Sequence, residues 1–378
     1  MKDSFRCWAE VDLDALRENL AWIRHRVGPK VKIMTVVKAD AYGHGIKQIA
    51  ALLMQSGTDI FGVANLAEAR AIHGVGKGWP VLMLGACLPE EVEPAVLDGV
   101  RPTLSTWAEA REFSRAAVRL SRVVHAHIEV DTGMGRLGVA PVRARELIVR
   151  AGRLAGIEVE GVYTHYSSVE DDVAFSRAQR MRFTKLLSEL EDISIPLIHA
   201  NNSGALLHEP DTVFNLVRPG LLVYGVVPPG RRRVASVLQG RLRPALSLKG
   251  RVSLVKEIPR GTALSYGRTF VAPHRMRVAT LTAGYGDGYP RAASNRAQVL
   301  VRGKRCRVLG RVTMDQLMVD VSRLPGVRAG EEAVLIGRQG RAEISAAELA
   351  AWCGTVPWEV LTNISYRVPR IYRGGQAA

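Results

Sequence analysis

The sequence contains few aromatic residues, few cysteines and no long hydrophobic run. Aromatic residues make up 6% of the 378 residues, and the cysteines stand far apart without a CxxC pair, as Cys7, Cys87, Cys306 and Cys353. This spacing indicates neither a zinc site nor a disulfide framework, and it is typical of a reducing compartment. No run approaches the length of a membrane span, and the first residues lack the apolar core of a secretory signal. We therefore expect a cytoplasmic protein with no metal and no membrane partner.

Acidic residues are also scarce relative to basic ones. The chain has 36 Asp and Glu against 52 Lys and Arg, which gives a formal net charge of +16. Such a charge raises the possibility of nucleic-acid binding. However, the densest basic clusters, at residues 231–233 and 301–311, contain no aromatic side chains on which bases could stack. We expect the positive field to attract small anions such as phosphates and carboxylates, and we expect no nucleic-acid partner.

The first two-thirds of the chain alternates short apolar runs with longer amphipathic stretches. Eight runs read as strands: residues 32–38, 60–65, 81–85, 101–105, 125–131, 159–165, 197–201 and 214–218. Eight strands with helices between most of them predict a (β/α)8 barrel of the TIM type, an α/β fold. An open doubly wound sheet is the alternative, but no GxGxxG sequence follows the first strand. We favour the barrel.

The pattern changes at residues 228–244, PPGRRRVASVLQGRLRP, which read as a linker. Beyond it, alternating apolar and polar residues with turn residues between them indicate several strands, followed by one helix candidate at residues 345–352. We therefore predict two domains, a cofactor-binding barrel at residues 1–240 and a mainly β domain at residues 241–378.

A single lysine ends the first predicted barrel strand. Lys38 follows the apolar run at residues 31–37 and precedes a small loop with two glycines at residues 39–45. A partly desolvated lysine favours its neutral, nucleophilic form, which a carbonyl cofactor such as pyridoxal phosphate requires for a Schiff base. On these residues alone, the favoured interpretation is a lysine that merely marks the point where a strand meets water.

Polar residues recur where the other predicted strands end. Tyr42 follows the first strand, residues 131–138 follow the fifth, and His165 ends the sixth. Residues 199–204 and 218–220 end the seventh and eighth. Because active sites of such barrels lie at the carboxyl ends of the strands, we expect these residues to meet on one rim.

Eight motifs, in order along the chain, resemble those of alanine racemases: VVKADAYGHG, DTGMGRLG, HANNSGA, VRPGLLVYG, SYGRTF, GYGDGYPR, VTMDQLMVD and SYRVPR. The resemblance covers nearly the whole chain. It implies an isomerase that uses pyridoxal phosphate on a barrel followed by a β domain. It further implies interconversion of L- and D-alanine by two-base proton exchange, supply of D-alanine for the peptidoglycan of the cell wall, and a homodimer with shared active sites.

The resemblance assigns the two bases. Lys38 would hold the cofactor and exchange the proton of D-alanine, and Tyr266 would exchange that of L-alanine. Two bases on opposite faces satisfy the requirement of racemisation without rotation of the substrate. His165 and Arg218 would orient and tune Tyr266, and Arg218 would donate to the ring nitrogen of the cofactor.

The resemblance also implies the remaining contacts. The cofactor phosphate would lie among Tyr42, Ser203, Gly220 and Leu221. Arg136 and the backbone of Met314 would bind the substrate carboxylate, and the partner subunit would supply both Tyr266 and Met314. The entrance would be lined by Glu170, Tyr285, Arg291 and Arg311.

Two positions depart from the family pattern. Glu129 stands where many relatives carry a carbamylated lysine, and its own charge would orient Arg136; a bound anion near Arg136 is the alternative. Trp358, also expected to contact the cofactor, stands where a tyrosine normally donates a hydroxyl to the phosphate. An indole donates one N–H and accepts nothing. The bulkier ring would favour a small substrate.

Two other functions remain open at this point. The first is a racemase of serine or of a broader range of amino acids on the same scaffold. The second is a non-catalytic, single-barrel protein that binds pyridoxal phosphate. The second domain, with Tyr266 and Met314, argues against the carrier, which needs neither a second base nor a carboxylate contact.

Overall fold

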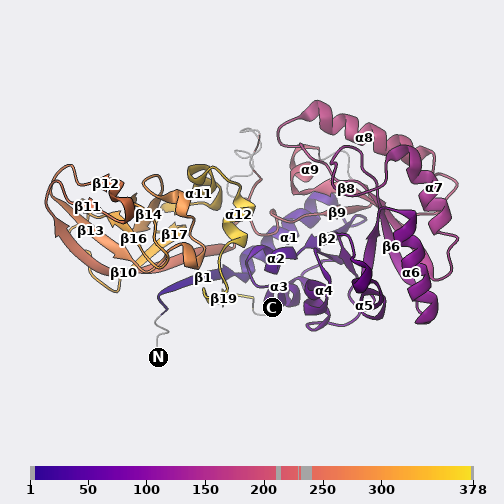
Figure 1. Cartoon of the computed structure of the whole chain (residues 1–378), viewed down its shortest axis with the longest axis horizontal. Helices are drawn as coiled ribbons and strands as arrows, with labels where there is room; N and C mark the ends of the chain where they lie inside the picture. Colours follow the sequence, from indigo (N-terminus) through magenta and orange to yellow (C-terminus); the bar gives the residue numbers. More distant parts are fainter. Residues whose placement is uncertain (1–4, 210–213, 229, 231–240, 376–378) are drawn as a thin grey trace.

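The computed structural model describes residues 5–209, 214–228, 230 and 241–375. In Figure 1 the chain forms two parts that lie side by side along the long axis, a barrel with helices and a mainly β part. Much of the predicted linker lies within residues 231–240, outside the described residues. The predicted domain boundary, between residues 240 and 241, lies at the edge of the same segment. Within the described part, no helix combines the length and apolar character needed to cross a bilayer.

The first part is a closed barrel of eight parallel strands, which confirms the predicted TIM-type fold. The strands are β2 (Lys32–Val36), β3 (Ile60–Val63), β4 (Val81–Met83), β5 (Arg101–Leu104), β6 (Val124–Glu129), β7 (Ile157–Tyr163), β8 (Leu197–Asn202) and β9 (Leu216–Arg218). Pairing of β9 with β2, with Lys32 opposite Leu216, closes the ring. Each strand corresponds to one of the apolar runs, because strands buried on both faces are nearly continuously hydrophobic.

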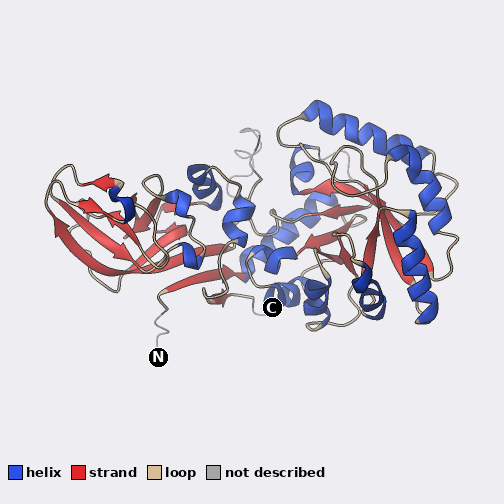
Figure 2. Ribbon diagram, viewed as in Figure 1, coloured by secondary structure: helices blue, strands red, loops and turns tan. Residues whose placement is uncertain are grey.

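Helices cover the outside of the barrel (Figure 2). They are α1 (Leu13–Val27), α3 (Ile46–Met54), α4 (Leu66–His73), α5 (Val92–Leu97), α6 (Trp107–Arg119), α7 (Pro141–Ala151), α8 (Val173–Ser188) and α9 (Ser203–His208). The short α2 (Lys38–Tyr42) has a left-handed backbone and forms the turn after β2 instead. Polar residues set several of their starts. Thr106 and Glu109, for example, form a capping box at the start of α6, each accepting a backbone N–H.

The second part is built on a nine-stranded sheet, in the order β18-β17-β14-β15-β16-β13-β10-β1-β19. Its strands are β1 (Cys7–Asp12), β10 (Leu246–Ile258), β13 (Met276–Leu281), β14 (Gln298–Val301), β15 (Lys304–Leu309), β16 (Leu317–Asp320), β17 (Glu332–Gln339), β18 (Ala342–Ile344) and β19 (Arg370–Arg373). A short pair, β11 (Ala263–Leu264) and β12 (Phe270–Val271), lies beside it, and α11 (Ala346–Cys353) and α12 (Pro357–Thr362) follow. The helix predicted at residues 345–352 is α11.

One strand of this sheet comes from the opposite end of the chain. β1 pairs with β10 in antiparallel register and with β19 in parallel register. The sequence pattern did not identify β1 as a strand. The described chain therefore runs from the sheet of the second part through the barrel and back to the same sheet.

The last strand of the second part also contacts the segment that carries Lys38. Arg370 Nε donates to the carbonyl of Gly43 at 3.1 Å, and the Tyr372 hydroxyl donates to the carbonyl of His44 at 3.0 Å. These bonds connect the second part to the segment that follows Lys38 in the barrel.

Candidate functional site

Lys38 begins a turn whose backbone has the left-handed conformation. The φ angles of residues 39–42 lie between 52° and 54°. Such a conformation costs an L-residue about 1–2 kcal/mol, so the surroundings must hold it. The carboxylate of Glu68, on α4, accepts the backbone N–H groups of Ala39 at 2.7 Å and Ala64 at 2.8 Å. It thereby ties the turn after β2 to the segment after β3.

Lys38 is half-buried. Burial lowers its pKa below the ordinary lysine value, and the positive charges of Arg136 and Arg218 lower it further, while Glu68 acts in the opposite direction. Burial removes water from the charged form, and neighbouring cations repel it. The neutral amine, which is the nucleophile, is therefore favoured.

Lys38 opens into a pocket of about 380 Å³ at the carboxyl ends of the barrel strands. The pocket also contains these predicted residues: Tyr42, His165, Glu170, Ser203, Gly220, Leu221 and Trp358. The structure thus brings together every predicted cofactor contact except Arg218, which lies behind His165. The polar residues that follow different barrel strands, such as Tyr42, His165 and Gly220, thus lie together at one rim of the barrel, as expected.

One end of the pocket is suited to an anion. Ser203 Oγ accepts the N–H of Gly220 at 2.9 Å, and the N–H of Leu221 donates to no residue in the described part of the chain. A Cβ at Gly220 would lie 2.5 Å from the Tyr42 hydroxyl oxygen, so glycine is required for that hydroxyl to approach. Two hydroxyls and a free backbone N–H therefore converge there.

Arg218 lies at the end of β9 and is only 3% exposed. Its Nη1 donates to His199 Nδ1 at 2.6 Å, and its Nη2 donates to backbone carbonyls and to His165 Nδ1 at 3.3 Å. Its Nε donates to no described residue, so that N–H remains for a bound group. Burial, followed by the charge of Arg218, lowers the pKa of His165 well below its ordinary value, which keeps that imidazole neutral.

Tyr266 and Met314 do not reach this pocket within one chain. They belong to the second part and are 70% and 52% exposed. Their loops lie together: Ser265 Oγ donates to the carbonyl of Arg311 at 2.6 Å, and the N–H of Tyr285 donates to the carbonyl of Thr313 at 3.0 Å. Two of the residues predicted at the entrance, Tyr285 and Arg311, therefore lie beside Tyr266 and Met314. Glu170 lies in the Lys38 pocket instead.

The expected contact between Glu129 and Arg136 is absent from the described structure. Glu129 ends β6, is buried, and accepts the Tyr163 hydroxyl at 3.0 Å inside the barrel. Burial raises the pKa of its carboxyl, against the opposing effects of Tyr163, Arg218 and Arg136. Its side chain points into the barrel interior, whereas Arg136 lies in the exposed loop that follows.

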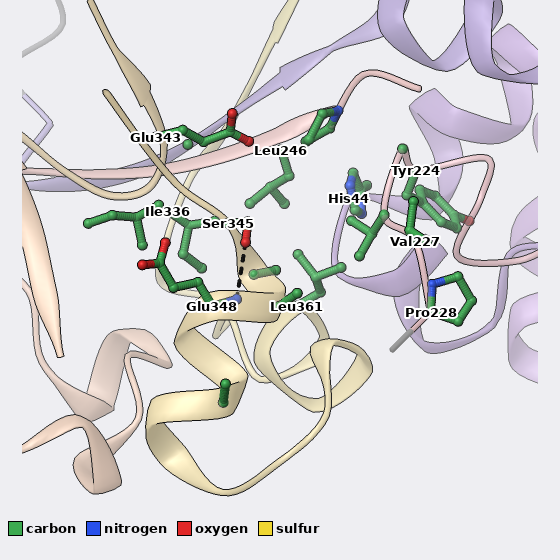
Figure 3. A pocket seen from close by; sticks show the side chains of 18 of the residues that line it. His44, Tyr224, Val227, Pro228, Leu246, Ile336, Glu343, Ser345, Glu348 and Leu361 are labelled. Carbon is green, nitrogen blue, oxygen red and sulfur yellow. Dashed lines mark hydrogen bonds between the residues drawn. The ribbon is translucent and has the colours of Figure 1, made fainter. Parts of the chain in front are cut away.

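A larger cavity, of about 700 Å³, lies where residues of the barrel and of the second part meet (Figure 3). His44, Tyr224, Leu246 and Ile336 line it, and its walls are mostly apolar. Among the described residues that line this cavity there is no predicted site residue and no lysine. We therefore place the chemistry in the smaller pocket, where the nucleophile and the anion-binding groups lie.

Sequence reasoning missed the buried polar groups inside the barrel. His127, Glu160 and Tyr163 were given no role, and His199 was quoted only within a motif. The available signal was an imidazole or carboxylate in an otherwise apolar barrel strand, as in the HAHIE sequence of β6.

Comparison with known proteins identifies both parts of the chain. Residues 11–228 match the family model "Alanine racemase, N-terminal domain", and residues 245–372 match "Alanine racemase, C-terminal domain". The chain belongs to the alanine racemase family. The alanine racemase of Symbiobacterium thermophilum is 43% identical over 374 residues, which cover 98% of each chain. The predicted family and the predicted enzyme class, an amino-acid racemase, are thereby confirmed.

Solved alanine racemase structures share the fold. The enzyme of Streptomyces lavendulae superposes with a TM-score of 0.92 at 35% identity, covering 98% of this chain and 97% of that one. The enzyme of Bartonella henselae, described with covalently bound pyridoxal phosphate, superposes with a TM-score of 0.88 at 27% identity, covering 98% of this chain and all of that one.

Proposed function

We propose that this alanine racemase uses pyridoxal phosphate held by Lys38, with L- and D-alanine as its substrates. The observation that carries the proposal is the half-buried Lys38, with its lowered pKa, on a left-handed turn in one pocket with an anion-binding end and beside a buried arginine. A cytoplasmic location and supply of D-alanine for peptidoglycan fit this activity and belong to the same proposal.

The residues present fit this cofactor. When bound, pyridoxal phosphate supplies a carbonyl carbon for attack by an amine and a conjugated ring that withdraws electrons from the substrate Cα. Tyr42, Ser203, Gly220 and Leu221 would hold its phosphate, and Trp358 would close the mouth of the pocket. Lys38 Nζ would attach it covalently.

Arg218 would face the ring nitrogen. A guanidinium only donates and keeps its proton, so the ring nitrogen would stay unprotonated and withdraw electrons less strongly. A weaker electron sink disfavours side reactions such as transamination and confines the chemistry to proton exchange at Cα.

Proton exchange requires one base on each face of the substrate. Lys38 would serve one face, and the partner subunit's Tyr266 would serve the other. The exposure of Tyr266 and Met314, and the distance of their loops from the pocket of their own chain, support a head-to-tail homodimer in which each subunit completes the other's site. Arg136 would bind the substrate carboxylate.

The test is isotope exchange. Purified protein with pyridoxal phosphate is incubated with L-alanine in deuterated water, and optical rotation and deuterium at Cα are followed. We expect rotation to vanish while deuterium enters Cα. Lys38→Ala should abolish both, and the control Lys47→Ala, at an exposed position on α3, should retain both. A cofactor absorbance band without exchange of alanine, serine or lysine would identify a cofactor-binding protein instead.

A further inference from the structure

A continuous row of hydrogen bonds crosses the barrel interior and ends at Arg218. At the amino end of the barrel, Arg101 donates to Glu160 at 2.6 Å. Glu160 Oε2 lies 3.2 Å from His127 Nε2, and His127 Nδ1 lies 2.8 Å from His199 Nε2. His199 Nδ1 then lies 2.6 Å from Arg218 Nη1, at the carboxyl end. The row therefore links the two ends of the barrel through its core.

The chemistry at the two ends determines the direction of every bond in the row. Arg218 can only donate, so His199 Nδ1 accepts and the single proton of a neutral His199 is on Nε2. This proton is donated to His127 Nδ1, which leaves the proton of His127 on Nε2, directed at the acceptor Glu160. Burial lowers the pKa of both imidazoles, consistent with their neutral forms.

The surrounding backbone is shaped around the two histidines. A Cβ at Gly161 would lie 2.4 Å from His127 Nδ1, so the glycine makes room for that ring. The register of β6 against β7 shifts between Ala126 and His127, and that of β8 against β9 shifts between His199 and Asn202. Such irregularities redirect side chains. Both histidines are fully buried.

Arg218 has no direct carboxylate partner. Among the described residues no carboxylate oxygen lies within ion-pair distance of its guanidinium. Glu129 influences it electrostatically but accepts its hydrogen bond from Tyr163. Although burial opposes ionisation of Glu160, hydrogen bonds from His127 and Arg101 hold its pKa at about 2, so it is a permanent anion.

We propose that Glu160, His127 and His199 form a one-way relay of hydrogen bonds that orients Arg218 and ends on an ionised carboxylate. Each donated bond makes the next imidazole nitrogen a better acceptor, because hydrogen bonds in series polarise one another. The three are positioning residues. The kinetic part of the argument rests on the proposed role of Arg218 toward the cofactor, whereas the direction of the relay rests on this chain alone.

The kinetic test compares two glutamates of β7. Glu160→Gln removes the charge at the end of the relay, and we expect kcat to fall about tenfold with little change in KM. The matched control is Glu158→Gln, because Glu158 pairs with His125 at 3.0 Å on the exposed face of the same two strands. We expect the control to keep its activity.

A double substitution distinguishes an effect that passes through the relay from a general loss of protein stability. His199→Phe preserves the ring that stacks on Tyr163 but interrupts the relay. When Glu160→Gln is added to the His199→Phe variant, we expect kcat to fall no further than in His199→Phe alone. Equal losses in both backgrounds would overturn the relay.

Nuclear magnetic resonance tests the direction without any turnover and applies even if a variant is inactive. In the holoenzyme with ¹⁵N-labelled histidine, long-range proton–nitrogen spectra identify which ring nitrogen carries the proton. We expect Nε2–H for His127 and His199 throughout the range in which free histidine titrates. Glu160→Gln should shift His199 Nδ1, and Glu158→Gln should not. A proton on Nδ1, or an imidazolium at neutral pH, would overturn the relay even if racemisation is established. Loss of racemisation with these spectra intact would overturn only the proposed function.

Discussion

The carboxylate of Glu68 offers the most direct way to test how the Lys38 turn is held. It accepts two backbone N–H groups, one from Ala39 within the turn and one from Ala64. Each bond to a partly exposed carboxylate is worth about 1 kcal/mol, and the position of Glu68 in the first turn of α4 adds about 0.5 kcal/mol. Glu68→Ala should therefore destabilise the turn by about 2–3 kcal/mol.

The stability lost in Glu68→Ala is a large fraction of the free energy that the left-handed backbone of this turn costs. Four consecutive left-handed residues cost about 4 kcal/mol or more relative to ordinary backbone, so the turn should open locally once Glu68 is removed. We expect cofactor affinity to fall by at least tenfold in an absorbance titration, and the free energy of unfolding in urea to fall by about 2 kcal/mol.

Glu68→Gln separates hydrogen bonding from charge. Its amide oxygen can still accept one N–H, so the turn should lose about half as much stability as in the alanine variant. Because Glu68 raises the pKa of Lys38, both variants should lower that pKa further. The exposed Glu191→Ala serves as the control. Unchanged cofactor affinity and unfolding energy in Glu68→Ala would refute the reasoning.

The other predictions concern the pocket and the barrel interior. Gly220→Ala should displace the Tyr42 hydroxyl and weaken cofactor binding by about tenfold in the same titration, because its Cβ would lie 2.5 Å from that oxygen. Trp358→Tyr should strengthen binding several-fold by adding a hydroxyl donor, and unchanged binding would contradict the contact. Because the pKa of Lys38 is lowered, borohydride trapping of pyridoxal phosphate by the apoprotein should reach half its maximal rate below the ordinary lysine pKa; a midpoint at that pKa would refute this. The ionised Glu160, with its pKa at about 2, should stabilise the fold above the ordinary glutamate pKa, and this contribution should disappear as pH falls toward 2. In Glu160→Gln, the free energy of unfolding should therefore fall less steeply as the pH is lowered toward 2. An unchanged acid dependence would contradict the ionised state of Glu160.

The barrel was predictable because its strands are buried on both faces. Runs such as residues 60–65 carry a strong apolar signal, and their order with the helices between them selects the topology. β1 was not predictable in the same way. Its six residues pair with β10 and β19, which come more than 230 residues later, and no local pattern encodes such a partner.

The positions of the site residues could be predicted from the sequence only where a motif residue stands at the end of a barrel strand. Lys38, Ser203 and Gly220 meet as expected, because strand ends of a parallel barrel share one rim. The sequence could not predict that the Glu129 side chain points into the barrel, since this depends on where β6 ends relative to the neighbouring strands. The relay residues were missed because register shifts, invisible in sequence, turn His127 and His199 toward each other.

The bonds from Arg370 and Tyr372 to the backbone beside Lys38 make the two parts of this enzyme mutually dependent. Without the second part, the turn that presents the amine would lose this outer support. The presentation of the nucleophile is in this sense a property of both parts of the chain. A copy that lacks β19 should therefore hold this turn less firmly, and bind the cofactor more weakly, than the full chain.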